Sequence, residues 1–280
     1  MCTLIAATAA GTVAAAPRPG AVADALAVPV LVTAGLASHE AVFNQVLAAD
    51  EAADRAWGAL TTKEALATHQ KQLRERWMAS FGGFPARTPL NARVTGSVDR
   101  EGYKIEKVLF ESQPGHFVTG HLFLPQAPAF KSPFPAVLIC CGHSGNGKAS
   151  KDYQRGAVLA AQAGLAALIY DPIDQGERLQ LPGKKPPHNV HGHNITGVSA
   201  MLLGWNTARF RIWDGMRALD YLQERPEIDK QRLGVMGNSG GGTLSSYIMA
   251  LDDRIGAGAP SCYISTLRDV CDRCGPQDAE

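Results

Sequence analysis

The spacing of apolar and polar positions divides residues 38–125 into a helical part and a β-rich part. From about Ser38 to Phe81, apolar residues recur every three or four positions with charges between them, which predicts helices over about 40–57 and 62–81. Gly82, Gly83 and Pro85 then end the second helix. From residue 92 the pattern becomes β-rich and partly alternating, which predicts an antiparallel meander over about 92–100, 103–112 and 116–125.

From Pro135 onward, short apolar runs alternate with helical patterns. The runs predict buried strands over 136–141, 165–171, 232–237 and 255–261, and the segments between them predict helices over 153–164, 210–225 and 241–252. This alternation is typical of a mostly parallel sheet with helices on both faces, so the fold class is α/β. The predicted organisation is an Ala-rich leader at 1–37, a helical extension at 38–92 and an α/β core at 93–280.

Composition narrows the partners. The chain has 280 residues, 45% of them hydrophobic, and a formal net charge of +1 with a pI near 7.7. No overall field attracts nucleic acid or an anionic membrane. After the leader, no run reaches the roughly 18 apolar residues that a membrane span needs.

The first residues, MCTLIAATAAGTVAAAPRPG, end in an A-x-A-like pattern before Pro17. The first basic residue is Arg18, so the positive start of a signal peptide is missing. The pattern favours a signal-peptide remnant over a disordered leader, and hence a secreted or periplasmic protein; a cytoplasmic location stays open.

The six cysteines do not fix the compartment. Cys140 and Cys141 end an apolar run and are expected to be small core residues. Cys271 and Cys274 form a lone C-x-x-C, which is weak for zinc and equally consistent with a local disulfide. No metal and no cofactor are predicted.

The strongest motif is Gly237-Asn238-Ser239-Gly240-Gly241, which fits G-x-S-x-G between a predicted strand and a predicted helix. A serine at the apex of so tight a turn takes a strained backbone, and neighbours two positions away must lack side chains. We therefore expect Ser239 to be a nucleophile and the Gly240 N–H to help form an oxyanion hole. The alternative is a plain glycine turn.

The segment Gly142 to Lys148 has two interpretations. It nearly fits the phosphate-binding G-x-x-x-x-G-K-[ST], with Asp171 imitating a magnesium-binding acid, but Ala149 stands where the hydroxyl is needed. We favour an oxyanion loop in which His143 belongs to the loop and the Ser144 N–H is the second donor. On this interpretation the protein does not bind nucleotides.

Histidines raise two further questions. His188, His191 and His193 lie close together, and we expect a surface or lid loop there; a metal site is the alternative. In this type of enzyme the chain order is the serine nucleophile, then an acid, then a histidine. All eight histidines of this chain precede Ser239. This predicts a C-terminally truncated core whose acid and histidine lie beyond residue 280; a base recruited from His143 or the histidine-rich segment is the rival.

Four acids follow the last predicted strand: Asp269, Asp272, Asp278 and Glu280. One of them could orient a catalytic imidazole, because in some enzymes of this type the acid follows the strand after the nucleophile helix. Solvation of a loop is the favoured interpretation, so none is included in the predicted catalytic set.

Several segments together suggest a family. CGHSGNGK, YDPIDQGER, RALDYLQERPEIDKQRLGVMGNSGGGT and ALDDRI resemble the α/β-hydrolase esterases described as acetyl xylan esterase-like, from about Arg74 to the end of the chain. The resemblance implies Ser239 as nucleophile and oxyanion donors from Gly240 and from the loop at His143 and Ser144. The chain departs from the family pattern by lacking a later acid–histidine pair.

We therefore expect a serine esterase that deacetylates carbohydrate or similar small acyl esters through an acyl-enzyme, with no nucleic-acid or membrane partner. The oligomeric state stays open. The alternatives are a peptidase of the prolyl-oligopeptidase type, which would normally carry a β-propeller, and a non-catalytic binding module on a hydrolase scaffold. The stretch ahead of the core shows no blade-like repeats.

Overall fold

The structure is a computed structural model that describes residues 39–126, 128–180, 191–266 and 268–270. The chain separates into two compact units, which are described one at a time. One comprises Met1–His69 with Ser265–Pro276, and the other Gln70–Ile264 with Gln277–Glu280. The second unit begins at Gln70, inside a helix. The predicted domain boundary at residue 92 therefore lies within the second unit.

The first unit is helical where it is described. Helix α2 spans His39–Gly58, and α3, Lys63–Ser80, continues into the second unit. Both match the predicted helices to within two residues. The Thr62 hydroxyl accepts a hydrogen bond from the Ala65 N–H at 3.1 Å and so caps the start of α3.

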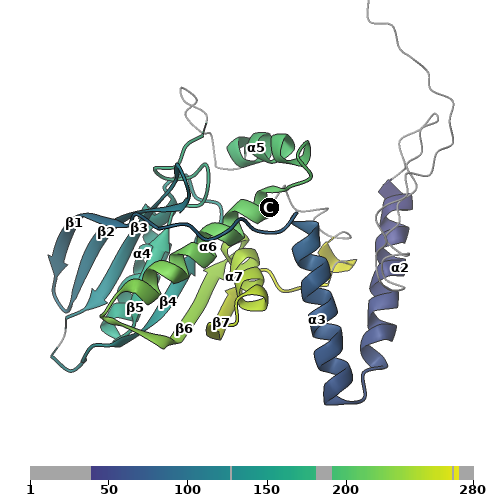
Figure 1. The fold of residues 1–280 in the computed structure, drawn as a ribbon, viewed down its shortest axis with the longest axis horizontal. Helices are drawn as coiled ribbons and strands as arrows, with labels where there is room; N and C mark the ends of the chain where they lie inside the picture. Colours follow the sequence, from purple (N-terminus) through teal and green to yellow (C-terminus); the bar gives the residue numbers. More distant parts are fainter. Residues whose placement is uncertain (1–38, 127, 181–190, 267, 271–280) are drawn as a thin grey trace, which may run out of the picture. The chain divides into compact units, whose positions relative to one another are not determined.

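The described part of the second unit contains a seven-stranded sheet in the order β1-β2-β3-β5-β4-β6-β7 (Figure 1). The first three strands form the predicted antiparallel meander, and β5, β4, β6 and β7 run parallel to one another. The bounds are Arg93–Arg100, Tyr103–Gln113, His116–Pro125, Phe134–Cys140, Ala166–Tyr170, Ile228–Asn238 and Ile255–Ser261 for β1 to β7. The predicted α/β class is confirmed.

Side chains of the central strands alternate between two apolar cores. From β4, Leu138 and Cys140 pack with α6 (Thr207–Glu224) and α7 (Gly240–Leu251). Ile139, between them, packs with α4 (Lys151–Gln162) on the other face. Because strand side chains alternate at every residue, both faces need a helical cover. Figure 1 shows α6 in front of the sheet and α4 behind it.

One predicted loop is a helix. The segment His191–Met201 forms α5, so the expected surface or lid loop is wrong for His191 and His193, while His188 lies outside the described residues. Glycine and histidine are weak helix formers and hid the signal. The three-residue spacing of Ile195, Val198 and Met201 was the available clue.

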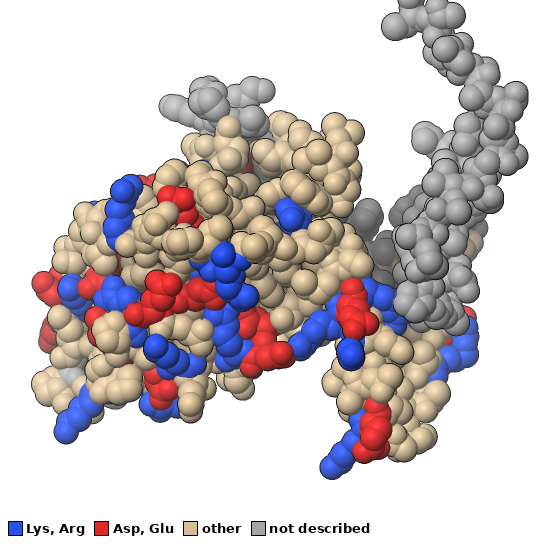
Figure 2. Space-filling view, in the orientation of Figure 1, with Lys and Arg blue, Asp and Glu red and all other residues tan. Residues whose placement is uncertain are grey.

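The surface carries no single-sign field on the face shown in Figure 2. Basic and acidic side chains are interspersed there, and the surface over α5 is mostly uncharged. Among the described helices, none is long and apolar enough to cross a membrane. Cys140 and Cys141 are buried, as predicted; Cys271 and Cys274 lie outside the described residues.

The two-core packing yields a stability prediction. Leu168 on β5 is fully buried, so Leu168→Ala should lower the free energy of unfolding by about 2–5 kcal/mol, through lost burial and the cavity left behind. Leu159 on α4 is 56% exposed, and Leu159→Ala should change it by less than about 1 kcal/mol. Urea unfolding of both variants measures the difference; equal losses would contradict the assigned core.

Candidate active site

Ser239 occupies the turn that joins β6 to α7. Its backbone has φ 56° and ψ −124°, a conformation that side chains rarely adopt and that costs roughly 1–3 kcal/mol. The turn is held at both ends. The Ser239 N–H donates to the Ser261 carbonyl at the end of β7, and the Ser239 carbonyl accepts from the Thr243 N–H, both at 2.9 Å. Ser239 itself is exposed.

Close backbone approach explains the surrounding glycines. A Cβ at Gly237 would lie 2.2 Å from the Gly241 carbonyl oxygen, and one at Gly241 would lie 2.1 Å from the Cys140 carbonyl oxygen. A Cβ at Gly142 would lie 2.6 Å from the Asn238 carbonyl oxygen. The steric reason predicted for Gly237 and Gly241 is therefore confirmed, and the same constraint extends to the loop after β4.

The start of α7 presents amide groups beside the serine. The first N–H groups of a helix have no partner inside the helix and carry its positive dipole end. Gly240 is the first residue of α7 and is buried next to the exposed Ser239. Among the described residues, no hydrogen bond to the Ser239 hydroxyl is found, so that hydroxyl is available to an incoming base or substrate.

The loop after β4 is tied down by two side chains. The Gly142 N–H donates to the Tyr153 hydroxyl of α4 at 2.6 Å, and the Ser144 N–H donates to Gln175 Oε1 at 2.7 Å. The Ser144 N–H can therefore serve a substrate oxygen only if the buried Gln175 side chain gives way. The oxyanion roles of Ser144, His143 and Gly240 stay predictions.

A cavity of about 470 Å³ opens beside this turn, at the carboxyl ends of β4 and β6. Ile139 and Met236 give it an apolar part, and Asp152 is the one aspartate, glutamate, lysine or arginine among the described residues that line it. It is lined by Ile139, His143, Ser144, Ser150, Asp152, Tyr153, Gly156, Met236, Gly237, Asn238, Ala259 and Ser261. His143 and Ser144 thus lie on the same cavity as the serine turn.

The loop that imitates a phosphate cradle is already filled by an internal anion. The buried Asp171 carboxylate accepts from the Lys148 N–H at 2.8 Å and from the Lys148 ammonium. It also accepts from the Thr119 hydroxyl at 2.6 Å and from the Glu177 N–H at 3.2 Å. A Cβ at Gly147 would lie 2.1 Å from Asp171 Oδ1. A nucleotide phosphate would have to displace this carboxylate, so the structure argues against the nucleotide site.

A second buried network supports the neighbouring loop. Arg178 donates to Asp214 Oδ2 at 2.7 Å and to the Asp171 carbonyl at 2.9 Å, and its Nη2 lies 2.8 Å from His116 Nε2. Arginine can only donate, so the imidazole nitrogen accepts. Burial alone would raise the pKa of the Asp214 carboxyl, but the positive charge of Arg178 counters burial, and the pKa lies below its usual value.

Other candidate groups are placed as follows. Burial raises the pKa of the Cys140 thiol to about 12 and that of Cys141 well above its usual value, so neither offers a thiolate nucleophile. Asp269 follows β7 and receives a hydrogen bond from the Thr266 hydroxyl at 3.3 Å. Asp272, Asp278 and Glu280 lie outside the described residues.

The strained serine between a parallel strand and a helix, on this sheet order, defines an α/β-hydrolase. The sequence model of the family "Acetyl xylan esterase (AXE1)" matches residues 86–272, about two thirds of the chain. The chain therefore belongs to that family.

Individual proteins resemble this chain in sequence or in structure. "Putative hydrolase YtaP" of Bacillus subtilis is 27% identical over 199 residues, which cover 65% of this chain and 60% of that protein. A putative acetyl xylan esterase from Bacteroides fragilis superposes with a TM-score of 0.65 at 21% identity, covering 79% of this chain and 62% of the other. "Methylesterase BT1017" superposes with a TM-score of 0.61 at 24% identity, covering 81% of this chain and 47% of the other. The chain thus spans less than two thirds of each of these proteins.

Sequence reasoning missed the residues that position the site. Gln175, Arg178 and Asp171 lie within YDPIDQGER, a segment that carries the family resemblance, but the sequence singles out only Asp171 there, as the imitation of a magnesium-binding acid. Their partners Lys148, Ser144 and Asp214 are 23 to 36 positions away. No local period signals such pairs.

The glycine contacts yield a matched pair of variants. Gly241→Ala places a methyl group against the Cys140 carbonyl and should destabilise the protein by about 3 kcal/mol while disordering the serine turn. Gly156→Ala on α4 meets only Ile139 Cδ1, at 3.9 Å, and should stabilise the protein by about 0.5–1 kcal/mol. Thermal unfolding of both variants measures these changes. A Gly241→Ala protein as stable as the parent would show that Gly241 does not lie so close to the Cys140 carbonyl.

The Asp214 network yields a pH prediction. Because the folded-state pKa of Asp214 is lowered, its stabilising effect is fully present above the unfolded value near 3.8 and is lost as the pH falls from there through the lower folded pKa. Asp214→Asn leaves Arg178 buried without its countercharge and should cost about 3 kcal/mol at neutral pH. The variant should lose less additional stability than the parent between neutral pH and about pH 3.

Asp229 provides the control for this experiment, since it pairs with Arg232 at the surface at 2.6 Å. Asp229→Asn should leave stability at neutral pH close to the parent's. Parallel pH curves for the parent and Asp214→Asn would contradict the assigned ionised pair.

Proposed function

We propose that this protein is a serine carboxylic-ester hydrolase that removes small acyl groups from carbohydrate esters through an acyl-enzyme on Ser239. The observation that carries the proposal is the exposed serine, held in a strained backbone at the first turn of α7. Such strain persists only where surrounding structure enforces it, and it is concentrated at functional sites.

In the proposed reaction the Ser239 oxygen attacks the ester carbonyl carbon, and its proton passes to a base. The Gly240 N–H and a donor from the His143–Ser144 loop stabilise the negative charge that develops on the carbonyl oxygen. Collapse of this intermediate expels the sugar alcohol and leaves Ser239 acylated. Water then attacks the acyl-enzyme and releases the carboxylic acid and the free serine. No metal or cofactor takes part in this scheme.

The substrate class rests on the family and on the cavity. The family is described by acetyl xylan esterase, a name that refers to the ester of a small acyl group on a carbohydrate. Ile139, Met236 and Ala259 line the cavity beside the serine, and among the described residues no lysine or arginine does. Such a lining suits an uncharged acyl group rather than a free carboxylate.

The competing functions have less support. A prolyl-oligopeptidase-type peptidase shares the serine turn, but the family match over residues 86–272 favours the esterase. A non-catalytic binding module predicts an intact fold with an unreactive serine. Reactivity of Ser239 therefore separates the module from the enzyme.

The test is covalent labelling of the natural protein with a fluorophosphonate, followed by turnover of an acetyl ester. Ser239→Ala should abolish labelling and lower turnover by roughly 10⁴-fold or more, since the nucleophile is lost. Ser246→Ala is the matched control, because Ser246 lies on α7 and its hydroxyl donates to the Gly242 carbonyl at 2.9 Å.

Ser246→Ala should label and turn over like the parent. Labelling that persists in Ser239→Ala would place the nucleophile elsewhere. A folded parent that neither labels nor turns over any sugar ester or peptide would favour the binding module.

A further inference from the structure

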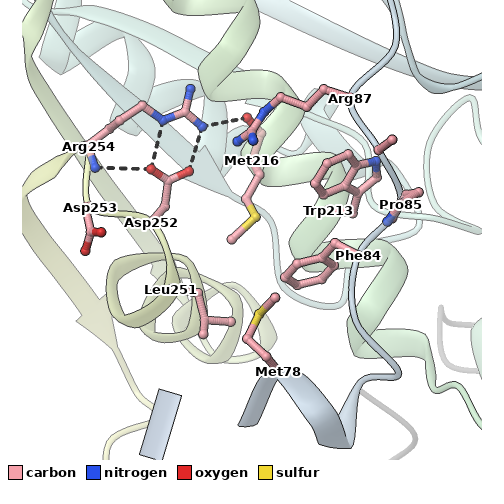
Figure 3. Close-up of a pocket in the computed structure, with 11 residues that line it drawn as sticks. Met78, Phe84, Pro85, Arg87, Trp213, Met216, Leu251, Asp252, Asp253 and Arg254 are labelled. Atoms are coloured by element: carbon pink, nitrogen blue, oxygen red, sulfur yellow. Dashed lines mark hydrogen bonds and ion pairs between the residues drawn. The ribbon is translucent and has the colours of Figure 1, made fainter. Parts of the chain in front are cut away.

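A second pocket lies at the C-terminal end of α7, whereas Ser239 lies at its N-terminal end. It has a volume of about 650 Å³, within the range of sites that bind small organic molecules. Leu251, the last residue of α7, lines it, whereas Ser239 precedes the first; α7 has 12 residues and is therefore about 18 Å long. The lining residues are Met78, Phe84, Pro85, Ala86, Arg87, Trp213, Met216, Leu251, Asp252, Asp253 and Arg254 (Figure 3).

The interior of this pocket is apolar and aromatic. Figure 3 shows Met78 and Met216 reaching toward each other between Leu251 and Phe84. The Phe84 and Trp213 rings stack with centroids 5.6 Å apart, and the Trp213 indole N–H is already bonded to the Ser112 carbonyl at 2.8 Å. Methionine side chains adapt to irregular ligands. The interior therefore suits an apolar or aromatic body that needs no hydrogen bond.

The pocket's own charged lining residues are Arg87, Arg254, Asp252 and Asp253, and the ion pairs that they form extend to Arg74, Arg217 and Asp220 behind the mouth. Three arginines converge on Asp220: Arg87 through Nε at 3.0 Å, Arg254 through Nη1 at 2.5 Å, and Arg217. Asp252 pairs with Arg254, and Asp253 pairs with Arg74 at 2.7 Å. Four arginines thus face three aspartates.

Arg87 is the arginine of the mouth whose hydrogen-bond donors are not all used within the described residues. Arg254 is fully engaged, because it also donates to the Gln223 side chain and the Met216 carbonyl. Arg87 uses only Nε, and among the described residues neither of its terminal amino groups has a hydrogen-bond acceptor. Its side chain is 56% exposed, with Cζ 5.7 Å from the centre of the Trp213 ring. Its position is thus fixed by Asp220 and Trp213, while two donor groups remain for a ligand.

We propose that this pocket binds a small monocarboxylic acid whose apolar or aromatic body lies among Met78, Phe84 and Met216 and whose carboxylate pairs with Arg87. Two terminal amino groups of one guanidinium match the two oxygens of a carboxylate. Asp252 and Asp253 at the same mouth disfavour a second negative charge, so a monocarboxylate should bind more tightly than a dicarboxylate or a phosphate. The site does not depend on the proposed ester hydrolysis.

The experiment is isothermal titration of the Ser239→Ala protein with cinnamate, and with cinnamyl alcohol as the uncharged analogue. Using the Ser239→Ala form keeps the result independent of the esterase proposal. Cinnamate should bind with a dissociation constant of about 1 mM or below, and the alcohol about tenfold more weakly. Arg87→Gln should weaken cinnamate about tenfold and leave the alcohol unchanged.

Two further variants sharpen the test. Asp253→Asn removes a negative charge from the mouth and should tighten cinnamate binding about twofold to threefold. Arg93→Gln, at an exposed arginine of β1 outside the pocket, should change nothing. Thermal unfolding of each variant shows whether it remains folded.

Equal binding of acid and alcohol would overturn the proposal, as would cinnamate binding that is insensitive to Arg87→Gln in a folded protein. No binding of cinnamate up to about 10 mM would overturn it too. If sedimentation shows a dimer of the parent that Arg87→Gln dissociates, the pocket is a self-interface and the proposal is overturned.

Discussion

Close backbone packing around Ser239 is the constraint on which the candidate active site depends. The Gly241 backbone lies against the Cys140 carbonyl, and Gly142 lies against the Asn238 carbonyl. These contacts join the end of β4 to the β6–α7 turn without any side chain between them. The Ser239 N–H, bonded to the Ser261 carbonyl, ties the same turn to β7. Three parallel strands therefore hold one residue in a conformation that it would not adopt alone.

Buried ion pairs hold the loops beside the serine turn in place. Asp171 gathers the Lys148 ammonium, the Lys148 N–H and the Thr119 hydroxyl, and so binds the loop after β4 to β3 and β5. Arg178 links the following loop to Asp214 on α6. Buried pairs of this kind add little net stability, but removal of one partner leaves an uncompensated charge. They fix geometry more than they add free energy.

The two ends of helix α7 lie at two chemically different sites. At its first residue, amide groups and an exposed hydroxyl lie beside a cavity that no described lysine or arginine lines. At its last residue, methionine and aromatic side chains lie below a group of arginines (Figure 3). The first arrangement suits an uncharged ester and the second an anion with an apolar body. The two sites can therefore be examined by independent substitutions.

The sequence by itself determined the elements whose signals are local. Period-two and period-3.6 patterns predicted the strands and most helices of the second unit, and the glycines around Ser239 predicted the strained turn, because sterics act over a few residues. Tertiary structure decided the rest. It made His191–Met201 a helix, gave the Ser144 N–H to Gln175, and placed Asp171 against Lys148. Those outcomes depend on groups 23 to 31 positions apart or on packing between elements, and sequence periodicity carries no information about which distant partner fills a donor or neutralises a charge.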